Sequence, residues 1–383
     1  MSVISARHFE TQHPVQIHVE GDRIQRITNA EDSPDLPWVS PGFFDIQING
    51  YDGRWFCSPD LTISDVSHVA RCLLARGVTR FFPTLITAGF EALEHGFRTL
   101  QMAAEQDALV DATVAGYHLE GPYISAEDGP RGAHPLQHVR DADIGEFDRL
   151  QAAAGGRIRL LTLAAESPGA PELIRHCRDQ GVIVALGHMA ANTDQIAAAV
   201  EAGAQLSTHL GNGAHGQLRR HPNYLWDQLA EDRLTASIIA DGWHLPPAVL
   251  KSFLRCKTPD RMLLTCDVSG FGGCAPGVYA EGDVGVEVLA DGRIVVAGQR
   301  QFLAGSGATT GDCVVHMAAA TELTLAETVH LATTAPARLF NERLPQLQEG
   351  DLATFTLFET PPESVSFVPV QTFFNGSPVD SPS

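Results

Sequence analysis

Eight short apolar runs, separated by longer amphipathic segments, constrain the fold of this chain more than any other feature. Runs as apolar as these are typical of parallel strands that are covered on both faces. Eight is the strand number of a (β/α)8 barrel, which takes about 250 residues. The pattern therefore predicts an α/β fold, a (β/α)8 TIM-type barrel over residues 41–340. In chain order the runs read FFDIQI, TRFFPTL, VAGYHLE, IRLLTLAAE, VIVALGH, QLSTHL, ASIIAD and MLLTCD.

Both ends of the chain have the alternating pattern of short strands. The segment VQIHVEGDRIQRI lies near the start, and LATFTLFETPPESVSFVPV lies near the end. We expect residues 1–40 and 341–383 to form one small composite β-sandwich domain, although two independent β-extensions would fit the same pattern. Within the barrel, the Asp-Gly pair of VGVEVLADGRIVVAG is a hairpin signal and predicts a β-hairpin insertion at about residues 276–300.

The charge balance of the chain argues against several classes of partner. Its 46 acidic and 26 basic residues give a formal net charge of -20, and a field of that sign repels nucleic acid and anionic membranes. No apolar run approaches the roughly 18 residues of a membrane span, and no signal-peptide pattern opens the chain. The seven cysteines are scattered without a CxxC pair, which suits free thiols in a reducing compartment. We expect a cytoplasmic protein that binds neither nucleic acid nor membranes.

Polar side chains, most of them able to bind a metal, stand at the ends of most of these runs. In a (β/α)8 barrel the C-terminal ends of the strands meet at one mouth, where the active site is built. A single histidine at such a position is more often a core residue, but several that converge in strand order indicate a site. The residues are Gln47, Asn49, His118, Glu120, His188, His209, Asp241, His244 and Asp267.

Glu120, His188 and His209 are the predicted metal ligands. Two imidazoles and one carboxylate, with water in the fourth place, make an open catalytic zinc site. Such a metal lowers the pKa of its water and polarises a bound carbonyl group. Asp267 then stands where a general base could take the proton of the water and pass it to a departing amine.

Several motifs in this order resemble those of the N-acetylglucosamine-6-phosphate deacetylases, which are amidohydrolases. The motifs are PGFFDIQINGYDG at 41–53, HLEGPY at 118–123, GH at 187–188, STHLGN at 207–212, ADGWH at 240–244, TCDVS around Asp267, LAGS at 303–306 and TTAPARLF at 333–340. The resemblance implies hydrolysis of the N-acetyl group of an amino sugar, with N-acetylglucosamine 6-phosphate as the expected substrate. It also implies one divalent ion per subunit, expected to be Zn²⁺ with Fe²⁺, Mn²⁺ or Co²⁺ as alternatives, and a homodimer.

The resemblance assigns roles to individual residues. Glu120, His188 and His209 match the metal ligands of the family, and Asp267 matches its catalytic acid/base. The positions that match substrate-binding residues are Ala133, His134, Asn212, Gly213, Asp241, Gly242, Trp243, His244, Leu303, Ala304 and Gly305, and spacing alone adds Arg220 to the expected substrate contacts.

Two departures from the family pattern bear on the chemistry. Many amidohydrolases carry His-x-His after the first strand, where this chain has Gln47-Ile48-Asn49. Amides are poor ligands for a transition metal, so we expect one ion in the mouth and not two. The basic phosphate contact is displaced into Arg219-Arg220-His221, where spacing favours Arg220. These arginines could instead lie on a solvated loop and pair with nearby acidic residues, namely Asp227, Glu231 or Asp232.

Other functions fit parts of the same pattern. The chain could be an amidohydrolase for a non-phosphorylated N-acetyl amino sugar or another N-acyl substrate, or a metal-free binding paralogue. Glu166, at the end of the fourth run, could be a ligand or base, although a structural role is the simpler interpretation. The Gly-rich segment 269–277 lacks the Lys-Ser/Thr of a P-loop and is expected to be a mobile active-site loop.

Overall fold

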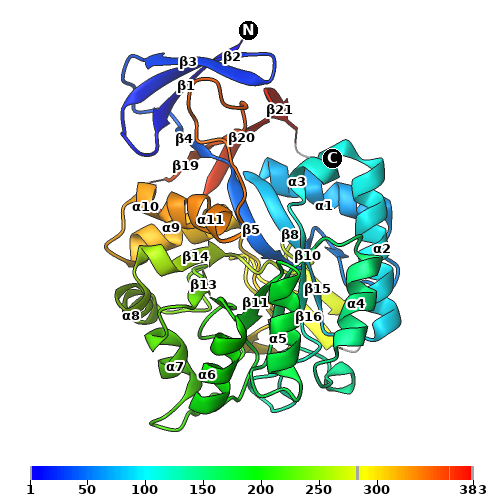
Figure 1. Ribbon diagram of the computed structural model, residues 1–383. Coiled ribbons are helices and arrows are strands. Elements are labelled where there is room, and N and C mark those ends of the chain that lie inside the picture. Colours follow the sequence, from blue (N-terminus) through cyan, green and yellow to red (C-terminus); the bar gives the residue numbers. More distant parts are fainter. Residues whose placement is uncertain (1, 282–283, 362, 381–383) are drawn as a thin grey trace.

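Eight parallel strands form the centre of the molecule in the computed structural model, which describes residues 2–281, 284–361 and 363–380 (Figure 1). Their order in the sheet is β14-β13-β12-β11-β10-β9-β8-β5. A parallel bridge between Ile48 and Val268 joins the two edges, and the Asn49 amide donates to the Val268 carbonyl at 2.9 Å. The predicted TIM-type barrel is thereby confirmed. The strands are β5 Phe43–Ile48, β8 Val78–Ile86, β9 Tyr117–Glu120, β10 Ile158–Leu163, β11 Ile183–Leu186, β12 Leu206–Ser207, β13 Thr235–Ile239 and β14 Met262–Thr265.

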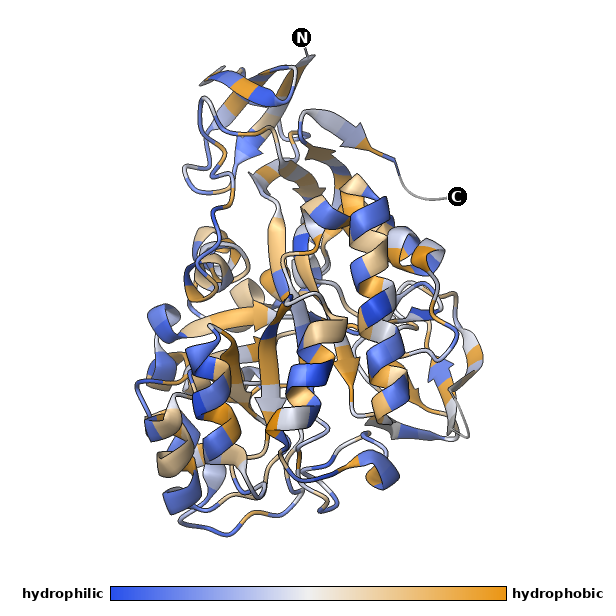
Figure 2. Ribbon diagram, turned by 45° about the vertical axis from the view of Figure 1, so that its right-hand side comes forward, coloured by the Kyte–Doolittle hydropathy of each residue, from blue (hydrophilic) through white to orange (hydrophobic). Residues whose placement is uncertain are grey.

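Helices surround the barrel, and Figure 2 shows apolar strands inside helices that carry both polar and apolar residues. The starts of the helices follow from the sequence: the Thr62 and Asp65 side chains form a capping box before α1, and Asn192 with Gln195 does the same before α6. The helices are α1 Ile63–Ala75, α2 Phe90–Gln106, α3 Ala108–Thr113, α4 Ile144–Ala153, α5 Ala170–Asp179, α6 Thr193–Ala202, α7 Tyr224–Ala230, α8 Pro247–Lys257, α9 Thr310–Ala320, α10 Leu325–Leu331 and α11 Thr334–Leu339, with short 3-10 turns η1 Leu136–His138 and η2 Pro259–Arg261.

The two termini of the chain share one seven-stranded sheet at the end of the barrel where β5 begins (Figure 1). The antiparallel pairing of β4 with β19 joins the N-terminal strands to the C-terminal ones, and Ile17, Val39 and Phe355 are buried in its core. The prediction that both ends build one β-unit agrees with this sheet, while the domain boundaries at 40 and 341 stay a prediction. The order is β21 Ser377–Val379, β20 Val368–Phe374, β19 Phe355–Glu359, β4 Trp38–Pro41, β1 Ser2–His8, β2 Pro14–Glu20 and β3 Arg23–Asn29.

The predicted hairpin insertion is part of a larger sheet. The turn through Asp291 and Gly292 joins β16 (Val284–Val288) to β17 (Ile294–Val296), as the Asp-Gly signal indicates. Strands β15 (Gly277–Glu281) and β18 (Gln299–Leu303) extend that hairpin to four antiparallel strands. Residues 282 and 283 of the predicted insertion lie outside the described part of the chain.

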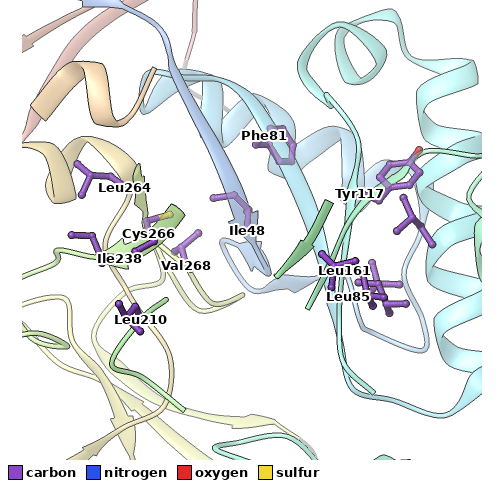
Figure 3. Close-up of a cluster of buried hydrophobic side chains, with 14 of the residues drawn as sticks. Ile48, Phe81, Leu85, Tyr117, Leu161, Leu210, Ile238, Leu264, Cys266 and Val268 are labelled. Carbon is purple, nitrogen blue, oxygen red and sulfur yellow. The ribbon is translucent and has the colours of Figure 1, made fainter. Parts of the chain in front are cut away.

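Two apolar clusters hold the barrel together. The larger one lies between the strands and the surrounding helices, and Figure 3 shows Ile48, Cys266 and Val268 of this cluster gathered where the barrel closes. The smaller one fills the interior at the N-terminal ends of the strands, where the Phe82 and Phe340 rings lie edge to face with centroids 4.7 Å apart. The interior near the C-terminal ends is therefore the part left for polar groups.

Candidate active site

Glu120, His188 and His209 meet at the C-terminal mouth of the barrel, as the sequence predicts. Glu120 ends β9, while His188 and His209 follow β11 and β12 by two residues. Their ligand atoms lie close together: Glu120 Oε1 is 3.2 Å from His188 Nε2 and 3.0 Å from His209 Nε2, and the two nitrogens are 3.0 Å apart. All three side chains are buried, so the cluster is desolvated and rigidly placed.

The hydrogen bonding of this cluster fits a cation. His188 Nδ1 lies 2.9 Å from the Pro130 carbonyl oxygen, to which it must donate. In a neutral ring this leaves the Nε2 lone pair facing a carboxylate oxygen and a second imidazole nitrogen. Acceptors this close need a proton or a cation between them. Burial alone would lower the pKa of His209, but the hydrogen bond and charge of Glu120 raise it, so the carboxylate favours a positive charge at this point. A divalent ion would take the place of that proton.

The backbone at the mouth is strained at the residues that carry the chemistry. His188, His209 and Asp267 have φ values of 49°, 27° and 50°, although none is glycine. Non-glycine residues enter the left-handed region only where the surrounding structure holds them, at a cost of about 1–3 kcal/mol each, and such residues cluster at functional sites. Sequence patterns gave no sign of this strain.

Asp267 follows β14 by two residues and faces the cluster. The side-chain amide of Asn49, directly after β5, holds it in place. Asn49 Nδ2 donates to Asp267 Oδ1 at 2.7 Å. Burial, together with the negative charge of Glu120, raises the pKa of Asp267 to about 7. Asn49, an amide in place of the second histidine of a His-x-His pair, thus positions the predicted acid/base in this chain.

These residues line one cavity of about 930 Å³. Besides the three predicted ligands and Asp267, it contains eight of the predicted substrate-binding residues: Ala133, His134, Asn212, Gly213, His244, Leu303, Ala304 and Gly305. Glycine suits position 213, since a Cβ there would lie 2.7 Å from His188 Nδ1. Segments far apart in the sequence therefore converge on one cavity of a size suited to a small molecule.

Comparison with known proteins agrees with this geometry. Residues 38–379 match the Amidohydrolase family. The chain belongs to the amidohydrolase family. N-acetylglucosamine-6-phosphate deacetylase from Bos taurus is 35% identical over 332 residues, covering 84% of this chain and 79% of that protein. N-acetylgalactosamine-6-phosphate deacetylase from Escherichia coli O157:H7 is 33% identical over 307 residues, covering 80% of this chain and 78% of that protein.

A solved structure shows the same fold over the whole length. It is that of an Asp-to-Ala mutant of N-acetyl-D-glucosamine-6-phosphate deacetylase from Mycobacterium smegmatis, in complex with N-acetyl-D-glucosamine-6-phosphate. The TM-score is 0.84 at 28% identity, and the match covers 99% of this chain and 100% of that one. This amidohydrolase is therefore a hydrolase of the deacetylase type, in a family that depends on a metal.

His134 lies beside the predicted ligands, and its hydrogen bonds define its protonation state. A nitrogen of its ring lies within 4.8 Å of ligand atoms of Glu120 and His188. Its Nδ1, however, accepts from the Thr87 amide at 3.4 Å and contacts the Thr87 hydroxyl at 2.8 Å. Burial, with His188 adding to it, lowers the pKa of His134 to about 3. The ring is therefore neutral with its proton on Nε2, which suits a hydrogen-bond donor to substrate better than a fourth ligand.

Of the four residues predicted to bind substrate at 241–244, His244 lines the cavity. Asp241 is buried and accepts from the Trp243 and His244 amides at 2.8 Å each, and its other oxygen lies 2.7 Å from His244 Nδ1. Asp241 thus orients His244, which lines the cavity. Gly242 and Trp243 lie outside the lining, and the Trp243 ring packs under the Arg293 guanidinium with 4.5 Å between them. Direct contact of Asp241, Gly242 or Trp243 with substrate stays a prediction.

The basic residue in the cavity wall is Arg131, which the sequence analysis did not single out. Among the described residues that line the cavity it is the only arginine or lysine, and it donates to the His134 carbonyl at 2.9 Å. The signal was present, because Arg131 opens the same RGAH stretch that points to His134. Arg220, in contrast, is exposed and lies outside the lining.

The acidic residues that could have neutralised Arg219 and Arg220 have other partners. Glu231 pairs with Arg233, Asp232 pairs with Arg261, and Asp227 accepts from the Thr193 hydroxyl. Within the described ranges, neither Arg219 nor Arg220 forms a side-chain ion pair.

The remaining predictions concern Glu166 and the Gly-rich segment. Glu166 accepts from the Ala190 amide, just after His188, and is absent from the cavity lining, which agrees with a structural role. The Gly-rich segment 269–277 does border the cavity through Ser269. Its mobility stays a prediction. Among the helices that the structure describes, none is long and apolar enough to cross a membrane.

Proposed function

We propose that this amidohydrolase removes the acetyl group of an N-acetyl amino sugar 6-phosphate, most simply N-acetylglucosamine 6-phosphate, giving acetate and the free amine. The observation that carries the proposal is the convergence of Glu120, His188 and His209 with Asp267 in one cavity. The deacetylases among the relatives support the choice of substrate class.

Glu120, His188 and His209 would hold one divalent ion, for which we propose Zn²⁺. Two imidazoles and a carboxylate are a common ligand set of catalytic zinc. When bound, the ion supplies Lewis-acid chemistry: it polarises the acetamide carbonyl and makes water a better nucleophile near neutral pH. Burial of the three side chains keeps competing water out of this set.

The side chains of the cavity would move and hold the protons. Asp267 takes a proton from the attacking water and delivers it to the departing nitrogen, because a carboxyl with a pKa near neutrality can both accept and donate. Asn49 fixes the direction of that carboxylate. His134 donates its Nε2 proton toward oxygen of the reacting amide, and His244, oriented by Asp241, donates to the sugar.

The phosphate group of the substrate would bind at the edge of the cavity. Asn212 and Arg131 line the cavity. Arg131, which also pairs with Asp128, would supply one guanidinium, and Arg220 would reach the anion from the neighbouring loop. Arginine suits this task because its planar fork binds two phosphate oxygens at once. A net charge of -20 makes such local cations necessary for an anionic substrate.

The test is a direct measurement of acetate release from N-acetylglucosamine 6-phosphate, N-acetylgalactosamine 6-phosphate and N-acetylglucosamine. We expect at least one of the two phosphates to be hydrolysed with a kcat/KM far above that of the neutral sugar. The galactosamine compound is included because one relative at 33% identity acts on it. Equal kcat/KM for phosphorylated and neutral sugars would refute the phosphate requirement, and no acetate from any of them would refute the proposed class.

The phosphate contact has a matched pair of variants. Arg220→Ala should raise KM for the 6-phosphate and leave that of the neutral sugar unchanged, whereas Arg219→Ala, its exposed neighbour, should change neither. The homodimer and the cytoplasmic location stay predictions alongside the proposed function.

A further inference from the structure

Away from the catalytic mouth, three metal-binding side chain types meet between a hairpin and helix α1. They are Asp52, in the turn between β6 (Gly50–Tyr51) and β7 (Arg54–Trp55), and His68 and Cys72 of α1. His68 Nε2 lies 2.8 Å from Asp52 Oδ2 and 3.2 Å from Cys72 Sγ, and one ligand atom of each residue lies within 4.8 Å of the other two. Two of the three donor pairs are thus as close as those of the catalytic cluster.

Regular structure sets this spacing. His68 and Cys72 are four residues apart on one helix, which places their side chains on the same face. Asp52 and Gly53 form a two-residue hairpin turn with φ values of 52° and 78°, as a type I′ turn requires. The donors therefore come from two well-defined elements and not from a flexible loop.

The three groups cannot form a relay of the Cys-His-Asp kind. Such a relay uses the two opposite ring nitrogens, one toward the thiol and one toward the carboxylate. Here Asp52 and Cys72 both face Nε2 of His68, which can carry only one proton. A cation at the point where the three donors converge would be bound by all of them. Carboxylate, imidazole and thiolate together are ligands of Zn²⁺ and similar divalent ions.

The surroundings allow an ion to enter. The Asp52 side chain is 44% exposed and that of His68 is 21% exposed. Binding would break the S–H bond of Cys72, release its proton to solvent and form the bond from sulfur to the metal. Arg54 Nη1 lies 3.4 Å from Asp52 Oδ2. If the ion took Oδ2, the other carboxylate oxygen of Asp52 would remain available to Arg54.

We propose that Asp52, His68 and Cys72 form a second divalent-cation site, separate from the catalytic one, for a thiophilic ion such as Zn²⁺. The ion would tie the β6–β7 hairpin to α1. That hairpin also donates from Asp52 and Gly53 to the carbonyls of Gly272 and Gly270 at 2.7 and 2.8 Å, and it carries Trp55 into the cavity wall. An ion bound here would fix one wall of the substrate cavity. This inference goes beyond the proposed function and does not depend on it.

Cobalt titration of the full-length, metal-stripped protein under reducing conditions tests the proposal. The catalytic ligands Glu120, His188 and His209 contain no sulfur, so absorption from a thiolate-to-Co²⁺ charge transfer cannot come from the catalytic site. We expect this absorption to develop by the second molar equivalent of Co²⁺ in the native sequence. It should also develop in His209→Ala, which lacks a catalytic ligand.

Variants of the cluster complete the test. Cys72→Ala and His68→Gln should abolish the absorption, while Cys256→Ala, which changes an exposed thiol on α8, should keep it. Turnover of Cys72→Ala within a few-fold of the native value would confirm that the variant is folded. The proposal is overturned if the native protein shows no such absorption at two equivalents, or if the absorption survives in Cys72→Ala or in His68→Gln.

Discussion

One end of the barrel interior is lined by apolar side chains and the other by polar ones. At the N-terminal end the rings of Phe44, Phe82 and Phe340 pack edge to face or tilted, with centroids between 4.7 and 6.3 Å apart. At the C-terminal end Glu120 and His209 place desolvated polar atoms 3.0 Å apart on a strained backbone. Apolar burial stabilises the fold, whereas buried polar groups cost free energy unless something binds them. Stability and chemistry should therefore be separable by mutation at the two ends.

A layer of hydrogen-bonded side chains separates the two ends. His118 Nε2 lies 2.8 Å from the Thr162 hydroxyl, which lies 2.6 Å from that of Thr208. Burial lowers the pKa of His118 to about 4, so the ring is neutral. His118 is only two residues from Glu120 in the sequence, but its ring hydrogen-bonds to polar groups of the interior and is absent from the cavity lining.

The largest effect on activity is expected at the mouth. His209→Ala removes one of three ligands and should abolish both the binding of the catalytic ion and acetate release, while leaving the fold intact. His176→Ala, on the outer helix α5, should keep ion and activity. Metal analysis and turnover of the two variants make the comparison, and an active His209→Ala protein with a full complement of ion would show that the ligand assignment is wrong.

Asp267→Asn is expected to have the next largest effect. The change removes the proton acceptor but keeps the shape, and asparagine tolerates the left-handed backbone at this position. We expect kcat to fall by about 10²–10⁴-fold, the range of general acid–base catalysis, with the ion still bound. Asp260→Asn, on the exposed turn η2, serves as control. A rate within a few-fold of the native enzyme would contradict the proton-transfer role.

At the opposite end the expected loss is in stability. Phe340→Ala removes a ring that packs against Phe44 and Phe82, and truncations of this kind cost about 3–5 kcal/mol. Urea unfolding should show this loss, while the turnover per folded molecule should stay near the native value. If Phe340→Ala instead lowered turnover and left stability unchanged, the separation of the two ends would fail.

The smallest effect concerns the ion pairs that flank this apolar cluster. Glu342 accepts from Arg80 at 2.7 Å and from Arg159. Burial alone would raise the pKa of Glu342, but the two guanidinium groups lower it below its ordinary value of 4.5. The folded state thus gains stability from the carboxylate above pH 4.5 and loses it as pH falls through the lowered pKa.

Glu342→Gln should therefore destabilise the protein by about 1–2 kcal/mol at neutral pH, since the pair is only partly buried. The difference between the native protein and the variant should shrink as the pH falls below 4.5. Urea unfolding of both proteins across the acid range measures it. A difference that grows toward low pH would have the wrong sign for this interpretation.

The sequence was most informative where the barrel rule applies. Apolar runs predicted the strands, and the polar residue after each run predicted Glu120, His188, His209 and Asp267 at one mouth, because parallel strands of a barrel all end on the same side. The pairing of the two termini could also be predicted from the sequence. Neither terminal segment has a helical pattern, and a strand left with an unpaired edge would be prone to aggregation.

What the sequence could not supply depends on long-range geometry. The packing of Phe340 against Phe82 joins segments 258 residues apart, and no local pattern predicts it. The same is true of Arg131 in the cavity wall and of Asn49 as the partner of Asp267. A Cβ at Gly213 would lie 2.7 Å from the His188 ring, and no local pattern predicts such a contact.

The central claim is that an ion held at the mouth is required for hydrolysis, and one titration tests it most directly. Metal-stripped Cys72→Ala protein, which lacks the proposed second site, is returned to activity with Zn²⁺ while acetate release from N-acetylglucosamine 6-phosphate is followed. The account predicts negligible activity without the ion and a rise that levels off at one equivalent per chain. Full activity in the stripped protein, or a rise that requires two equivalents, would contradict it.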